Sequence, residues 1–174
     1  QNIEVENNAF GLRGYESFCL PYAGLQLERH TRRGSATRAS VDIETNLDGL
    51  ADTKDAQVAK LGRPNAQNDW TALHWNASHS FFLEPLIYGD SWEQPDTPET
   101  STLAHELSFQ FQGQESFDHR LIPQAQSVVG GTYTVRGYPE SVTAGDDVVV
   151  LRTEYRYHLP RAFQPNPDPP QVRL

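Results

Sequence analysis

Long stretches in which apolar and polar residues alternate with a period of two constrain this chain most. They cover residues 22–28, 37–47, 71–83, 103–112 and 149–157. Successive side chains of a β-strand point to opposite faces, so the pattern predicts strands with one apolar and one polar face. Because turn-prone segments join the stretches, we expect an all-β fold, an antiparallel meander of about five long strands.

The alternation fits two architectures. In a soluble β-sandwich the apolar face packs against a second sheet, whereas in an outer-membrane β-barrel it faces lipid and the polar face lines a wet lumen. The stretches exceed the usual strand length of about five or six residues. Their apolar faces are also rich in rings, as at a lipid-facing surface: Trp75, Phe81, Phe109, Phe111, Tyr155 and Tyr157. Both features favour the barrel.

The lengths of the connections alternate as well. A tight turn is predicted at Arg32–Gly34, whereas long loops at 48–69 and 113–146 fall at the opposite end of the hairpins. Barrels with short periplasmic turns and long outer loops have this arrangement. Residues 84–102 break the rule, because on this interpretation they form an unusually long periplasmic connection.

Composition is compatible with a barrel. The chain has no run of about twenty apolar residues, so it encodes no transmembrane helix, and a mean hydropathy of -0.63 suits alternating strands. The formal net charge of -9 argues against nucleic acid as a partner. Bacterial barrels begin at about eight strands, and the chain starts at Gln1 without a methionine. We therefore expect part of a longer protein.

Three segments are expected along the chain. Residues 1–21 form an irregular lead-in, which contains an Arg13-Gly14-Tyr15 tripeptide without a preceding glycine pair. Residues 22–159 form the partial barrel and include a long loop at 113–147. Residues 160–174 are proline-rich and predict a stiff, extended connector.

The candidate functional centre is a glycine-flanked loop, residues 129–141, that carries a single arginine. Its glycines allow backbone conformations closed to other residues. A guanidinium prefers a carboxylate or an aromatic face, and Tyr133 and Tyr138 bracket this one. The alternative is an ordinary exposed hairpin loop. The motif residues are Gly130, Gly131, Val135, Arg136, Gly137 and Tyr138.

The string Gly-Gly-Thr-Tyr-Thr-Val-Arg-Gly-Tyr at 130–138 is followed by Gly145-Asp146-Asp147 and a strand-like segment to Leu159. It resembles the signature of the two-partner-secretion outer-membrane transporters, the TpsB-type ShlB/FhaC/HecB haemolysin secretion/activation proteins of the BamA superfamily. The resemblance implies a Val-Arg-Gly-Tyr loop folded back into a barrel of about sixteen strands. It also implies that the arginine meets an aspartate on a later strand. No strand follows Leu174, so we expect that partner to lie outside this chain.

The resemblance further implies a pore in the bacterial outer membrane that secretes a haemolysin-like or adhesin-like polypeptide without ATP. Its partners would be that polypeptide, outer-membrane lipid, the rest of the barrel and periplasmic POTRA domains absent from this chain. The lumen-facing residues would include Glu106, Gln110, Gln112, Arg152, Glu154 and Arg156. Two alternatives remain, a BamA-like assembly factor for outer-membrane proteins and a soluble β-sandwich binding module.

We expect no enzymatic activity, no cofactor and no metal. The sequence contains no nucleophile–base spacing and no phosphate-binding loop. His105-Glu106 lacks the second histidine of a zinc-protease motif, and no Cys/His cluster occurs. The single Cys19 cannot form an internal disulfide.

Overall fold

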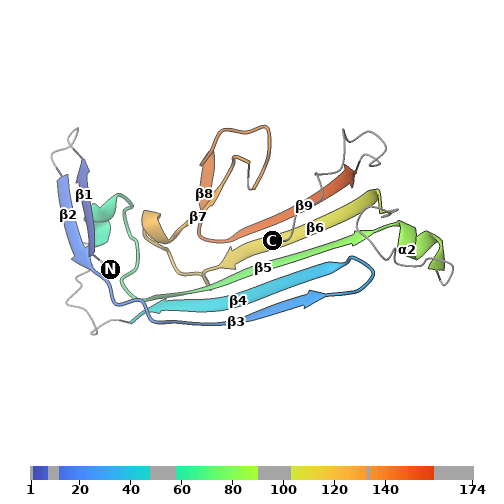
Figure 1. Ribbon diagram of the computed structural model, residues 1–174. Coiled ribbons are helices and arrows are strands. Elements are labelled where there is room, and N and C mark those ends of the chain that lie inside the picture. Colours follow the sequence, from blue (N-terminus) through green and yellow to red (C-terminus); the bar gives the residue numbers. More distant parts are fainter. Residues whose placement is uncertain (1, 8–11, 48–57, 90–102, 133, 159–174) are drawn as a thin grey trace, which may run out of the picture.

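A five-stranded antiparallel sheet dominates the computed structural model, which describes residues 2–7, 12–47, 58–89, 103–132 and 134–158 (Figure 1). The strand order β3-β4-β5-β6-β9 makes a meander in which each strand pairs with the preceding one in the sheet. The strands are β3 (Tyr22–His30), β4 (Ala36–Asn46), β5 (Trp70–Phe82), β6 (His105–Glu115) and β9 (Val148–Tyr157). The predicted all-β meander of long strands is therefore confirmed.

The register gives the sheet one apolar and one polar face. On the apolar face Ala77 lies opposite Phe111, and Phe111 lies opposite Leu151. On the polar face Gln110 lies between Ser78 and Arg152. Among the described residues the apolar face is not covered by a second sheet, since Leu25 is 78% and Leu151 69% exposed.

The two ends of the sheet differ. At one end a short turn joins β3 to β4, closed by a bond from the Thr31 amide to the Ser35 carbonyl (2.9 Å). The single-turn helix α2 (Glu84–Ile87) follows β5 at the same end. Its buried Glu84 carboxylate accepts hydrogen bonds from the amides of Ala104 (2.8 Å) and His105 (2.9 Å) and so fixes the start of β6.

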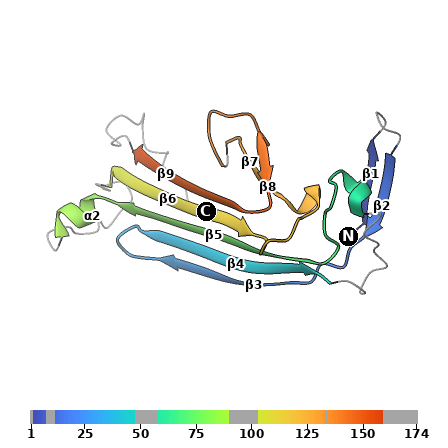
Figure 2. The ribbon, with the colours of Figure 1, turned by 180° about the vertical axis from the view of Figure 1, so that it is seen from behind.

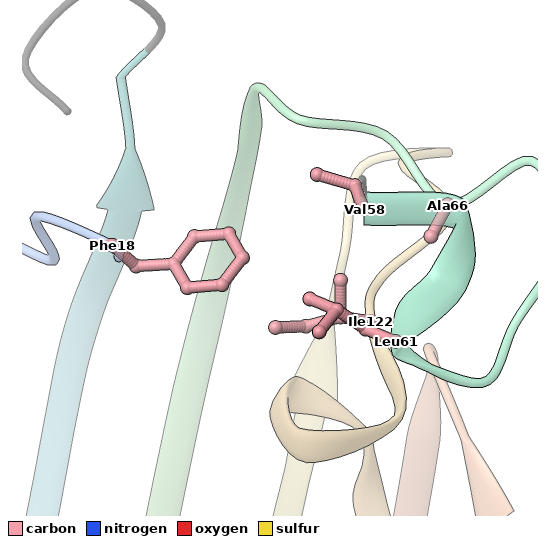
Figure 3. Packing of buried hydrophobic residues seen from close by; sticks show 5 residues of the cluster. All are labelled: Phe18, Val58, Leu61, Ala66 and Ile122. Atoms are coloured by element: carbon pink, nitrogen blue, oxygen red, sulfur yellow. The ribbon is translucent and has the colours of Figure 1, made fainter. Parts of the chain in front are cut away.

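The opposite end carries the long connections and a small core (Figure 3). Phe18, Val58, Leu61, Ala66 and Ile122 form one buried cluster, and Leu61 is the last residue of the 3-10 turn η1 (Ala59–Leu61). A second cluster joins Trp70 and Ala72 of β5 to Leu121, and Leu20 and Ala125 pack against both. Because Trp70 and Ala72 share the polar face by register, that face becomes apolar here and the loops cover it.

The expected irregular lead-in at 1–21 is wrong for most of its length. Strand β1 (Asn2–Asn7) pairs with β2 (Leu12–Ser17) as an antiparallel hairpin beside η1. Ile3 and Val5 alternate with glutamates, but this alternation is too short to predict a strand without knowledge of its partner. The Arg13-Gly14-Tyr15 tripeptide lies within β2, where Gly14 pairs with Val5.

Trp75 lies on the apolar face above Gly113 of the neighbouring strand. A Cβ atom at Gly113 would come within 3.0 Å of both the Trp75 ring and the Val148 carbonyl oxygen. Glycine at this position therefore leaves room for the indole, whose ring centroid lies 6.0 Å from that of Phe111.

No helix in the described part of the chain is long and apolar enough to cross a membrane. The predicted connector at 160–174 lies outside the described residues.

Candidate functional site

The arginine loop is carried by a small hairpin between β6 and β9. Strand β7 (Ser127–Val129) follows the 3-10 turn η4 (Pro123–Ala125) and pairs with β8 (Thr143–Gly145). The predicted loop at 113–147 is thus partly regular, since β6 continues to Glu115 and the hairpin holds residues 130–142 at its tip. Figure 2 shows the hairpin standing on one side of the sheet, beside the start of β9.

The hairpin lies over the polar face of the sheet. Ser127, Val128 and Val129 of β7 line a cavity of 230 Å³ whose other residues include His74 and Gln112, both on the polar face by register. Further along β9, the Arg152 guanidinium donates a hydrogen bond to the Thr132 carbonyl oxygen (3.5 Å). The loop is therefore folded back toward the sheet.

Glycines shape the root of the loop. Gly130 and Gly131 adopt positive φ angles of 127° and 83°, which L-residues with a Cβ rarely adopt. A Cβ at Gly130 would also collide with the Pro139 carbonyl oxygen. The Thr134 hydroxyl bonds both the amide and the carbonyl of Gly130 at 2.7 Å and closes this turn. Gly137, directly after the arginine, has φ 92°.

Arg136 has a carboxylate partner within the chain, contrary to expectation. Its Nη2 lies 3.0 Å from Oε1 of Glu154 on β9. The Glu154 side chain is only 12% exposed, whereas that of Arg136 is 60% exposed. The pair is therefore anchored on the sheet side and open to solvent on the loop side.

Glu154 forms ion pairs with two further arginines. Its Oε1 is 3.3 Å from Arg152 Nε, and its Oε2 accepts a hydrogen bond from Arg156 Nη2 at 2.7 Å. Removing Arg136 would leave this carboxylate with two arginines, but removing Glu154 would leave three arginines without it. Glu154 is thus the centre of the cluster.

The six predicted lumen-facing residues do share the polar face. In register Glu106 faces Arg156, Ser108 faces Glu154 and Gln110 faces Arg152. Arg156 also approaches Glu106 at 3.6 Å, and the Gln110 amide donates to the Gln112 carbonyl oxygen at 2.9 Å. Charges of both signs alternate with amides, and a cavity of 390 Å³ opens among them, lined by Gln26, Arg38, Ala39, Ser40, Asn76, Ser78, Ser108, Gln110 and Arg152.

Tyr138 does not provide the aromatic face that was expected for the arginine. Tyr138 is 61% exposed, and among the described residues it makes no ring contact with Arg136. Tyr133 lies outside the described residues. Val135, the remaining motif residue, is partly buried.

Sequence reasoning missed an ion pair that ties the loop root to a distant segment. Arg63 Nη1 donates to Asp146 Oδ1 and to the Leu121 carbonyl oxygen (2.9 Å). The Gln126 amide donates to the same Asp146 oxygen (3.0 Å), and the Gln114 amide to the Asp146 carbonyl (2.9 Å). The Gly145-Asp146-Asp147 triplet pointed to this site, but nothing in the sequence marked Arg63.

Asp147 provides a second attachment. Its Oδ1 accepts hydrogen bonds from both the amide and the hydroxyl of Ser116, each at 2.7 Å. Because Ser116 directly follows β6 and Asp147 directly precedes β9, the base of the hairpin is fixed where both strands meet it. The base of the hairpin is therefore attached to both strands of the sheet that flank it.

We expect Asp146→Asn to loosen this root by about 1 kcal/mol, since a charge-assisted bond is lost. Burial opposes ionisation, but hydrogen bonds from Arg63 and Gln126 hold the pKa of Asp146 below its ordinary value. Its stabilisation is therefore full above the unfolded pKa of about 3.9 and lost as pH falls through the lower folded value.

Hydrogen exchange in residues 118–126 measures this effect. After correction for the intrinsic pH dependence of amide exchange, protection in the wild-type protein should stay constant between neutral pH and about pH 5 and should fall below about pH 4. Asp146→Asn should show the lower protection already at neutral pH. Asp118→Asn, the same change at an exposed position of the same loop, is the control. Equal protection in both variants would contradict the role of the Arg63–Asp146 pair.

Residues 90–171 match the model of the haemolysin secretion/activation protein family ShlB/FhaC/HecB. The resemblance of the arginine-loop segment to that family is thus confirmed for this part of the chain. The match covers β6, the loop hairpin and β9, so the family segment contains both Arg136 and Glu154. No curated protein and no solved structure matches the chain.

Members of the family are two-partner-secretion transporters of the outer membrane, and a secreted polypeptide is their partner. The chain is accordingly placed in the bacterial outer membrane. Among the described residues no group of three or more His, Cys, Asp or Glu side chains is arranged to hold a metal ion.

Proposed function

We propose that the polar face of the sheet forms part of the wall of a pore through which a secreted polypeptide passes unfolded and without ATP. The observation that carries the proposal is the position of the arginine loop. It folds over the polar face and is held there by Arg136 and Glu154. In this arrangement the loop occupies the path that the polypeptide would follow.

The chemistry of the wall supports passage without tight binding. Arginines and glutamates on this face neutralise one another in pairs, as in Arg38–Glu28 (2.9 Å) and Arg156–Glu154 (2.7 Å). The neighbouring amides and hydroxyls can exchange hydrogen bonds with any peptide backbone. Such a wall favours no particular sequence, which suits a large haemolysin-like or adhesin-like cargo.

The apolar face would contact lipid. Leu25, Val149 and Leu151 are between 65% and 78% exposed, and burying them in lipid would be favourable. Strands of nine to thirteen residues are long enough to cross a bilayer at a tilt. Closure would require further strands beyond β3 and β9, because an open sheet edge in lipid is costly. We propose that these strands and POTRA domains belong to the complete protein.

The proposed role is transport, not catalysis. Geometry and electrostatics suffice for it, and folding of the cargo outside the cell would help to prevent its return.

Site-specific cross-linking tests the proposal. A photoreactive residue is placed at Gln110 on the polar face or at Phe109, its neighbour on the apolar face. The intact protein is reconstituted in liposomes without nucleotide and supplied with unfolded cargo that carries a bulky stopper. We expect cargo to cross-link to position 110 and lipid to position 109.

Two outcomes would overturn the proposal. Cargo cross-linking from position 109 alone would mean that the faces are inverted or that the cargo does not pass here. Cross-linking from position 110 that requires added nucleotide would contradict transport without ATP. A stopper-free cargo, which clears the pore, serves as the control for a transit intermediate.

A further inference from the structure

A groove at the short-turn end of the sheet is not explained by transport. It has a volume of 370 Å³ and lies between the β3–β4 turn, the end of β5 and α2. Four of its lining residues are apolar, namely Phe81, Phe82, Pro85 and Leu86. The other four carry polar groups, namely Thr31, Arg33, Ser35 and His79. The groove thus suits an amphiphilic ligand.

Its polar side offers an unused cation. Arg33 is exposed and, within the described part of the chain, forms no ion pair. The hydroxyls of Thr31 and Ser35 share one hydrogen bond of 2.7 Å, so one hydroxyl hydrogen stays available. A guanidinium beside a free hydroxyl is a suitable donor set for a phosphate oxygen.

The surroundings of the groove are apolar and exposed. Leu86, Ile87 and Tyr88 are 65%, 70% and 60% exposed, although they lie next to each other at α2. On the apolar face of β9, Tyr155 and Tyr157, which pair with residues at the start of β6, are also at least half exposed. Tyrosines and apolar side chains at the end of a membrane-facing sheet are typical of the lipid head-group region.

We propose that this groove binds a glycerophospholipid of the periplasmic leaflet. The phosphodiester contacts Arg33 and the hydroxyls of the turn, and an acyl chain runs over Phe81 and Leu86 onto the apolar face. His79, whose Nδ1 is bonded to the Thr37 hydroxyl at 2.8 Å, holds the turn side of the groove in place. The inference rests on the proposed lipid-facing orientation of the apolar face.

Native mass spectrometry of the intact protein in detergent, titrated with phosphatidylglycerol, tests the site. Loss of a charge-assisted hydrogen bond predicts that Arg33→Gln weakens one lipid-binding step by roughly tenfold. Arg32→Gln removes the same charge from the same turn, but Arg32 is exposed and does not line the groove. It should leave that step unchanged.

A second pair of variants tests the apolar side. Leu86→Ser should weaken the same step several-fold because its side chain lines the groove, whereas Ile87→Ser, equally exposed, should not. Inorganic phosphate at the same concentration should not compete. Diacylglycerol, which lacks the phosphate, should bind more weakly and show no difference between Arg33→Gln and wild type.

Each contrary outcome overturns the proposal. Equal weakening by Arg32→Gln and Arg33→Gln would indicate unspecific charge attraction. Competition by inorganic phosphate without an effect of Leu86→Ser would indicate a simple anion site. Undiminished lipid binding in both Arg33→Gln and Leu86→Ser would show that the lipid does not bind in the groove and would favour a protein partner there. The cross-linking result at Gln110 does not depend on this lipid, so the two proposals fail separately.

Discussion

Replacement of Glu154 by alanine is expected to reduce secretion about tenfold while the barrel still assembles. The carboxylate is the shared partner of Arg136, Arg152 and Arg156. Its loss removes the contact that holds the loop and leaves three like charges together. The arginines are partly solvated, so we expect a cost of about 1–2 kcal/mol, below the 3–5 typical of a fully buried pair. About 1.4 kcal/mol shifts a two-state loop equilibrium tenfold.

Arg136→Ala should act in the same direction but less strongly. This side chain is 60% exposed, and Glu154 keeps two arginines when it is lost. Glu140→Ala removes a carboxylate from the same loop that is exposed and has no ion pair among the described residues, so it should secrete normally.

The measurement compares cargo in the medium with the amount of heat-modifiable barrel in the outer membrane. Normal barrel levels with little secreted cargo support a loop that must be positioned for transport. Loss of the barrel itself in Glu154→Ala would show that the pair only stabilises the fold. Undiminished secretion in both Glu154→Ala and Arg136→Ala would contradict the proposed role.

Lysine at Leu151 is expected to lower the yield of assembled barrel severely. Leu151 lies on the apolar face of β9, opposite Phe111 of β6, and is 69% exposed. A lysine facing lipid near the middle of the membrane costs about 2–4 kcal/mol in a barrel. That is a large part of the stability of an ordinary domain, about 5–15 kcal/mol.

Ser108→Lys is the control. Ser108 lies on the neighbouring strand β6, points to the opposite face and lines the polar cavity beside Gln110 and Arg152. A lysine there stays hydrated and has Glu154 directly opposite, so assembly should be nearly normal. Yield is measured as the heat-modifiable form in purified outer membranes. Equal yields for the two variants would mean that the apolar face does not meet lipid.

The meander and its two faces could be predicted because they depend on local information. Alternation over a long strand decides which residues share a face. A register shift of one residue would move every apolar side chain to the polar face of the sheet. Alternation therefore assigns Phe109 and Gln110 to opposite faces without any information on strand pairing. Gly130 and Gly131 likewise indicate their own backbone conformation, since the requirement for positive φ belongs to the residue itself.

The contacts of the site could not be predicted, because each joins segments far apart in the chain. Arg63 reaches Asp146 only after β5 and β6 have brought the two long loops to the same end of the sheet. β1 and β2 can be recognised as strands only once their pairing with each other is known.

The partner of Arg136 shows the same division. The order of residues supplied an arginine on a glycine-flanked loop and a glutamate on the polar face of the next strand of the sheet. Whether the two would meet depended on which way the hairpin bends, and no local preference encodes that direction. Packing of Leu121 and Ala125 against β5 residues, together with the Asp146 and Asp147 bonds at the hairpin base, directs the hairpin over the polar face and brings Arg136 to Glu154.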